Sequence, residues 1–188
     1  MMGKTHLQIG IAASLVIYEC CMPEPLDMAV IAGGVLIGSI FPDADEVNSI
    51  MGRKLKIVSI PLRVINIIFW LLNILTLKKI KFLNRAYRTT AHRGILHTVF
   101  SIVVPIVVGI IVISIPLLHL LCVGLFIGML LHVDADMISG KVALFLPISE
   151  KKYGIVLIPV NSVREKILRL LIMVANIIIL MRIGGITL

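Results

Sequence analysis

Long apolar runs alternate with short polar segments along the whole chain. The runs that we expect to form helices cover residues 5–20, 28–41, 95–115, 117–131 and 167–181. Runs of this kind are typical of helices whose solvent is lipid. The first two are short for full spans, which suits helices tilted into a protein-lined hollow. The second is rich in Gly and Ala, which favours close helix packing in lipid. No alternating pattern is long enough to outweigh the helices.

One apolar run, residues 59–77, differs from the others. It contains Arg63, Asn66 and Asn73, which are costly in a helix that faces lipid on all sides. We therefore expect an interfacial or re-entrant helix here. The predicted fold class is all-α: an integral membrane helical bundle of about four principal helices plus this interfacial helix, forming a single domain over residues 1–188.

The composition supports a membrane protein. The chain has 188 residues, 59% of them hydrophobic, and a mean hydropathy of +1.09. A soluble domain is nearer to about half apolar. The net charge of +8 would suggest nucleic acid in a soluble protein. In a membrane protein, basic loops set the topology and contact anionic lipid. We therefore expect membrane lipids, and not nucleic acid, as the main partners.

Lysine and arginine positions predict the orientation. Loops 42–57, 78–94 and 132–166 hold nearly all of these residues, whereas loops 21–27 and 115–119 hold none. Because cytoplasmic loops are enriched in Lys and Arg, the basic loops and the N-terminus should face the cytoplasm. This places a multi-pass chain in an inner or plasma membrane, provided that the 59–77 run does not cross.

Histidines and aspartates gather at the same predicted membrane level. His132 and Asp136 are four residues apart and would share one helix face, which suits a metal with mixed nitrogen and oxygen ligands. The alternative is an ordinary hydrogen-bonded pair at a helix end. Asp43 and Asp45 repel each other unless a cation or hydrogen-bond donors lie between them. Their alternative is a solvated turn with an aspartate cap.

The segment His92-Arg-Gly-Ile-Leu-His97 is more specific. Gly94 permits an irregular turn on which both imidazoles converge. Arg93 is a fixed cation suited to a phosphate or a carboxylate. His97 enters a membrane helix, where ionisable residues usually have a function. His6 lies one turn into the first helix, close to the interface.

Seven side chains are therefore candidate metal ligands: His6, Asp43, Asp45, His92, His97, His132 and Asp136. They exceed the needs of one tetrahedral metal and suit a two-metal site with positions open for water. We expect one or two divalent ions, with zinc as the expected metal. Such ions would lower the pKa of a bound water and hold the oxygens of a phosphate.

Taken together, these motifs form a set that can be compared with known families. The set comprises His6, Pro42-Asp43-x-Asp45, His92-Arg93-Gly94-x-x-His97, His132-x-x-x-Asp136, and Pro147-Ile-Ser149 before Lys152-Tyr153-Gly154. It resembles, nearly from end to end, the YdjM-like (LexA-regulated) family of membrane-bound, metal-dependent hydrolases. That family is similar to zinc-dependent phospholipase C and single-strand nucleases, so the resemblance implies a helical fold and phosphoester hydrolysis. Thr98, Ser139 and Asp134 depart from the family pattern.

The expected function is a membrane-bound, metal-dependent hydrolase of a phosphoester, such as a phospholipid or lipid-linked phosphate, at the cytoplasmic interface. Arg93 would stabilise charge developing on the phosphate. Asp134, or one of the carboxylate ligands, would act as general base. Asp134 could instead bind metal or be merely solvated. A metalloprotease is disfavoured because HExxH is absent. A non-catalytic metal-binding transporter, sensor or adaptor is the alternative, and the oligomeric state is undefined.

Overall fold

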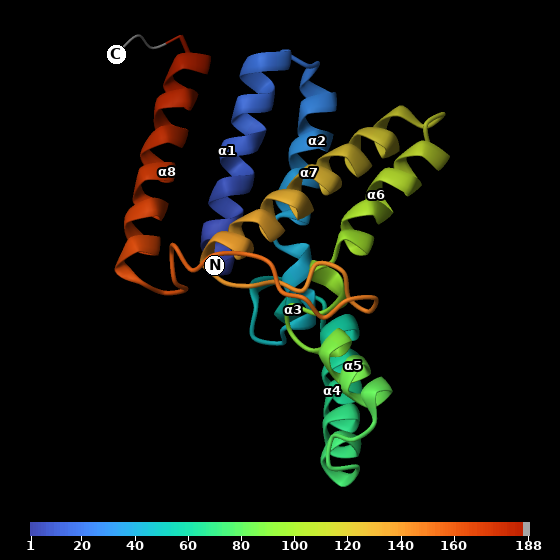
Figure 1. Cartoon of the computed structure of the whole chain (residues 1–188). Coiled ribbons are helices and arrows are strands. Elements are labelled where there is room, and N and C mark those ends of the chain that lie inside the picture. The colour runs from blue at the N-terminus through green and yellow to red at the C-terminus, as the bar shows by residue number, and fades with distance from the viewer. Residues whose placement is uncertain (186–188) are drawn as a thin grey trace.

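The computed structural model describes residues 1–185, which are helical almost throughout (Figure 1). The elements are α1 (Gly3–Cys21), α2 (Pro25–Gly38), η1 (Phe41–Asp45), α3 (Ile50–Lys54), α4 (Lys56–Leu75), α5 (Lys81–Thr90), η2 (Ile95–His97), α6 (Val99–Ile111), α7 (Pro116–Ser139) and α8 (Val163–Ile183). Within residues 1–185 the only β-pairing is two isolated bridges in the last loop. The predicted all-α class is confirmed.

Five helices, α1, α2, α6, α7 and α8, form the body of the molecule (Figure 1). The sequence predicted about four principal helices, so this number is not confirmed. At one end of the body, α1, α6 and α8 begin while α2 and α7 end. The segments that carry the candidate ligands therefore meet at one level. By length and composition, α4 and α7 could each cross a membrane, and α2 and α6 are shorter apolar helices.

Helices α2 and α7 pack with their backbones almost in contact. The contact is made by glycines spaced four apart on each helix: Gly34 and Gly38 on α2, and Gly124 and Gly128 on α7. A Cβ atom at Gly34 would lie 2.5 Å from the carbonyl oxygen of Leu121. One at Gly128 would lie 2.2 Å from the carbonyl oxygen of Val35. Small residues at this spacing let helices approach closely in lipid, as the glycines of α2 predicted.

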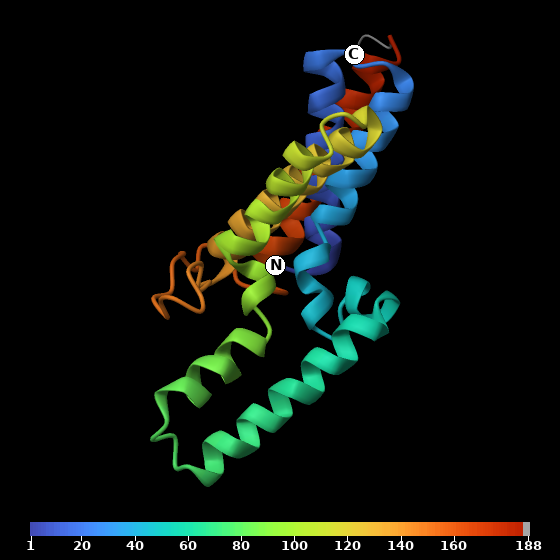
Figure 2. The same cartoon turned by 90° about the vertical axis from the view of Figure 1, so that its right-hand side faces the viewer.

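Helices α4 and α5 form an antiparallel hairpin that extends away from the body, beyond the end where the ligand segments meet (Figures 1 and 2). The amide of Asn66 donates to the carbonyl of Tyr87 at 2.8 Å, and that of Asn73 donates to the carbonyl of Leu83 at 3.0 Å. The two asparagines that distinguish the 59–77 run from the other apolar runs thus join α4 to α5. Since the chain leaves along α4 and returns along α5, the hairpin does not separate Asp43 from His92.

The predicted C-terminal end of α7, which carries two of the candidate ligands, was wrong. We expected a helix to end at Leu131 and a loop to begin at His132, because polar residues start there. Instead α7 continues to Ser139. The extension is possible because His132 and Asp136 are buried on one face of the helix, where they meet other polar side chains rather than lipid.

Substituting Gly34 by Ala should separate α2 from α7 and destabilise the protein. The added methyl group overlaps backbone atoms that cannot move aside, and overpacking of this kind costs on the order of 1–3 kcal/mol. Gly33→Ala is the matched control, since nothing lies within 4 Å of a Cβ at that position. Thermal unfolding in detergent measures both. Equal midpoints for the two variants would show that the close α2–α7 packing does not hold the fold together.

Candidate metal centre

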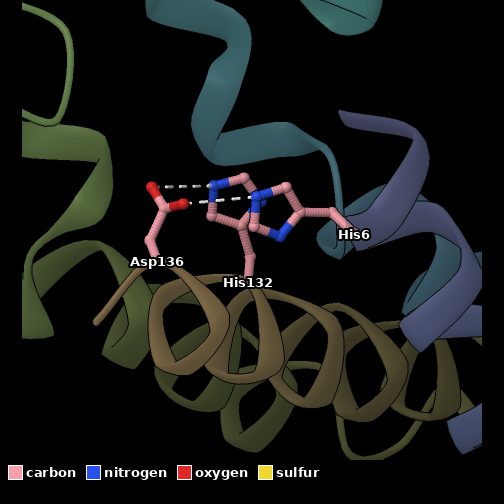
Figure 3. Close-up of side chains that lie close together, drawn as sticks. All are labelled: His6, His132 and Asp136. Carbon is pink, nitrogen blue, oxygen red and sulfur yellow. Dashed lines mark ion pairs between the residues drawn. The ribbon is translucent and has the colours of Figure 1, made fainter. Parts of the chain in front are cut away.

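Five buried ionisable side chains meet at the shared end of the helices, and we call them the ligand cluster. They are His6 from α1, Asp43 from η1, His97 from η2, and His132 and Asp136 from α7. Each is at most 8% exposed. Figure 3 shows the imidazoles of His6 and His132 side by side, with the carboxylate of Asp136 facing both. The two rings are stacked, with centroids 3.8 Å apart.

The donor atoms are spaced as ligands of a metal ion are. Nε2 of His132 lies 3.2 Å from Nε2 of His97 and 3.5 Å from Oδ1 of Asp43. Nε2 of His97 lies 3.7 Å from Oδ1 of Asp43 and 3.6 Å from Oδ2 of Asp136. Bonds of about 2.0–2.1 Å place neighbouring donors of a tetrahedral ion about 3.4 Å apart. The separations in the cluster are close to this value.

The cluster contains two overlapping ligand groups. One is His6, His132 and Asp136, and the other is Asp43, His97 and His132. A single Nε2 lone pair binds one ion, so His132 cannot serve both groups at once. Asp136 directs Oδ1 toward His6 at 3.3 Å and Oδ2 toward His97 at 3.6 Å. It is therefore the carboxylate placed to face two ions, if two are bound.

Unpartnered atoms show that these residues fit a metal. Both ring nitrogens of His6 are buried without a hydrogen-bond partner, and its Nε2 faces the carboxylate of Asp136. A buried polar group left unpaired costs about 1–3 kcal/mol. A divalent cation accepts lone pairs from imidazole nitrogen and carboxylate oxygen and would remove part of this cost.

Neighbouring groups orient two of the imidazoles. Nδ1 of His132 lies 2.8 Å from the carbonyl oxygen of Ser39 and can donate to it, which leaves Nε2 free for a metal. Nδ1 of His97 faces Oδ2 of Asp45 at 3.6 Å. Carbonyl and carboxylate partners of this kind fix the ring orientation of metal-binding histidines. Sequence reasoning missed Ser39, because a backbone carbonyl leaves no signal in residue type.

The side chains on the connecting segments balance one another's charge. Burial alone would raise the pKa of Asp43, but His97 and His132 favour its ionised form and lower the pKa to about 2. Burial also opposes ionisation of Asp45, yet His92 and His97 lower its pKa. Desolvation would lower the pKa of His97, but the two aspartates outweigh it and raise the pKa to about 9. These buried carboxylates favour a cation, which a divalent ion would supply.

Asp45 and His92, both predicted as ligands, join neither ligand group. They pair with each other instead, with Nδ1 of His92 3.0 Å from Oδ1 of Asp45. The His92 side chain is 42% exposed, unlike the buried histidines. Its ring meets that of His97 edge-on, with centroids 5.5 Å apart. His92 thus lies between the cluster and solvent, a position that suits proton transfer better than coordination.

Arg93 contacts the cluster through Asp136. Its Nε lies 3.0 Å from Oδ2 of Asp136, and its Nη2 donates to Oδ1 at 3.1 Å. The backbone of Arg93 has a φ of +61°, which is uncommon for a residue other than glycine. The two-point contact holds both oxygens of Asp136. The arginine predicted to bind phosphate is therefore also a partner of a candidate metal ligand.

The general base predicted at Asp134 is not supported. Asp134 is exposed, and it lies two residues from both His132 and Asp136, which puts it on the opposite side of α7. Within residues 1–185, no hydrogen bond or ion pair joins it to the cluster. The two aspartates of this short motif look equivalent in the sequence. They differ in the structure because they lie on opposite faces of α7.

Glu165 is a site residue that sequence reasoning missed. It is fully buried on α8, and its carboxylate accepts from the Thr5 hydroxyl at 2.9 Å and from the backbone N–H of Asn161 at 2.6 Å. This fixes the first turn of α1, which carries His6. A signal was available: Ser162 caps α8 by accepting from the backbone N–H of Glu165, and Ser-x-x-Glu is the pattern of a capped helix start.

Three further polar residues, Thr98, Ser139 and His119, form hydrogen bonds outside the two ligand groups. Thr98 caps α6 by accepting from the backbone N–H of Ser101 at 3.4 Å. Ser139 is buried, accepts from the nitrogen of Met1 at 2.9 Å and donates to the carbonyl of Asp136 at 3.2 Å. The ring of His119 contacts the carbonyl oxygen of Gly109 at 3.0 Å, near the turn between α6 and α7. His119 thus lies outside the cluster.

Comparison with known proteins gives one match. A family model described as YdjM inner membrane protein matches residues 1–186. No curated protein and no solved structure matches the chain significantly. The matched region includes every residue of the ligand cluster, as well as Arg93, His92 and Asp45.

Purified protein should contain one to two equivalents of zinc or a similar divalent metal, measured by elemental analysis. The double variant His132→Asn with Asp136→Asn should lose most of it, because His132 belongs to both ligand groups and Asp136 to one of them. His119→Asn is the matched control and should retain the metal. If the double variant keeps the native metal content while remaining folded, the cluster is not the metal site.

Proposed function

The chain belongs to the YdjM inner membrane protein family, and from this premise we propose that it is a membrane-bound, metal-dependent hydrolase of phosphoesters. A phospholipid or a lipid-linked phosphate is the proposed substrate. The observation that carries the proposal is the buried cluster with unpartnered ligand atoms, reached through the half-exposed His92.

We place the ligand cluster at the cytoplasmic face of the membrane, with the helical body crossing several times. Support comes from the shared end of the five helices, where the basic loops 42–57 and 132–166 lie and from which the hairpin that carries the basic segment 78–94 projects (Figure 1). The turns without Lys or Arg, after α1 and after α6, lie at the other end. This arrangement matches the preference of basic loops for the cytoplasm.

The chemistry divides among few residues. A divalent metal held by the cluster would supply Lewis-acid activation of water and of the phosphoryl group. His92, oriented by Asp45, is the proposed general acid and base in place of Asp134, since a positioned imidazole is the commonest group for this task. Arg93 orients Asp136 and presents a planar cation that can hold two oxygens of a phosphate.

His92→Asn should retain the metal yet lower kcat by roughly 10²–10⁴-fold, the usual contribution of general acid–base catalysis. The reason is that His92 lies outside both ligand groups. Asp134→Asn is the control and should hydrolyse as the native protein does, because its side chain points away from the cluster. Phosphate or alcohol release from a phosphoester panel measures both. Loss of activity in Asp134→Asn with native activity in His92→Asn would reverse the assignment.

Arg93→Lys separates catalysis from structural metal binding. Lysine keeps the charge but loses the fork that holds two oxygens, so kcat/KM should fall about tenfold or more, which is about 1.4 kcal/mol of transition-state stabilisation. Metal content should stay close to native, because the variant removes no candidate ligand and lysine can keep one charged contact to Asp136. Arg53→Lys, exposed on α3, is the control and should have little effect. Unchanged hydrolysis in Arg93→Lys would remove Arg93 from the reaction.

A further inference from the structure

A cavity of about 510 Å³ adjoins the ligand cluster, and we call it the basic cavity. Its walls come from α5, the segment after α5 and the loop after α7, and they include Tyr87, Arg88, His92, Arg93, Lys141 and Lys152. His92 and Arg93 belong to both the cavity wall and the proposed reaction site. A molecule bound in the cavity would therefore have one end at the cluster.

The charges around this cavity do not balance. Arg88 forms an ion pair with Glu150, and Arg93 is held by Asp136. Lys141 and Lys152 are exposed, and neither forms an ion pair anywhere in residues 1–185. Two lysines that come from different parts of one loop thus line the same cavity without a counter-charge.

We propose that the basic cavity is a subsite for a phosphate group with two negative charges, either a phosphomonoester or a terminal diphosphate. The inference rests on the proposed function and narrows its substrate class. Two uncompensated lysines match the charge of a phosphomonoester, which is about −1.5 to −2 at neutral pH. Lysine binds phosphate as a mobile point charge. A zwitterionic phosphodiester would bring its own cation against the two lysines and be disfavoured.

The surroundings are compatible with a lipid as the carrier of this phosphate. A second cavity of about 240 Å³ is lined by the aromatic rings of Phe69 and Phe82 and by Pro147. Pro147 directly follows Leu146, which lines the basic cavity. An apolar chain attached to the bound phosphate would find this surface on the α4–α5 hairpin. A soluble phosphomonoester would use the basic cavity alone.

Equilibrium binding to the metal-loaded, detergent-solubilised full chain tests the inference. The probe is a short-chain phosphonate analogue of phosphatidic acid, which is dianionic and resists hydrolysis. The double variant Lys141→Gln with Lys152→Gln should bind it about tenfold or more weakly, because two charge-assisted contacts are lost. Lys54→Gln with Lys166→Gln removes the same charge from exposed positions outside the cavity and should bind within about twofold of the native protein.

Two further ligands define the specificity. Short-chain phosphatidylcholine should not compete with the phosphonate. Glycerol 3-phosphate identifies the source: competition supports the subsite with a free phosphate ester as ligand, and lack of competition supports it with a lipid. Native affinity in the Lys141/Lys152 variant, equal binding of phosphatidylcholine, or no binding of the phosphonate by the native chain would each overturn the proposal.

Hydrolysis measured in parallel separates this inference from the proposed function. If the phosphonate binds with the expected lysine dependence but the native protein releases phosphate from no ester, the subsite stands and the hydrolase fails. If phosphate is released and the lysine variant keeps the native KM and affinity, the hydrolase stands and the subsite fails.

Discussion

Burying a polar side chain costs free energy unless it gains a hydrogen-bond, ionic or metal partner, and five ionisable side chains are buried together here. His6, Asp43, His97, His132 and Asp136 come from four separate elements, and several of their donor and acceptor atoms are left without hydrogen bonds. The rest of the architecture serves to bring these side chains together. The glycine contact between α2 and α7 sets Ser39 against His132, and Glu165 fixes the turn that carries His6.

The sequence predicted the parts of this arrangement that depend on local spacing. The four-residue separation of His132 and Asp136 predicted a shared helix face, and α7 has it. The glycines of α2 predicted close helix packing. The predicted family is confirmed by the match over residues 1–186. Hydrolysis, the metal and its identity remain proposals, because they depend on chemistry that neither spacing nor a family description supplies.

Contacts between residues far apart in the sequence were harder to predict. Asp134 was one candidate for the general base, but the helix turns its side chain away from His132 and Asp136. Asp45 and His92 were predicted as ligands, and only the returning path of the α4–α5 hairpin places them against each other. The count of about four principal helices is not confirmed, although the five apolar runs in the sequence correspond to the five helices of the body. The basic cavity joins α5 to residues more than 50 positions away, so no local pattern marks it.

X-ray absorption spectroscopy of the zinc-loaded protein tests the central claim, that the buried cluster is a metal centre. The account predicts nitrogen and oxygen ligands at about 2.0–2.1 Å, with the multiple scattering of imidazole rings and no sulfur in the coordination shell. The imidazole signal should diminish in His132→Asn. A sulfur shell at about 2.3 Å, which would point to the cysteines, or a shell of oxygen alone without imidazole, would contradict the account.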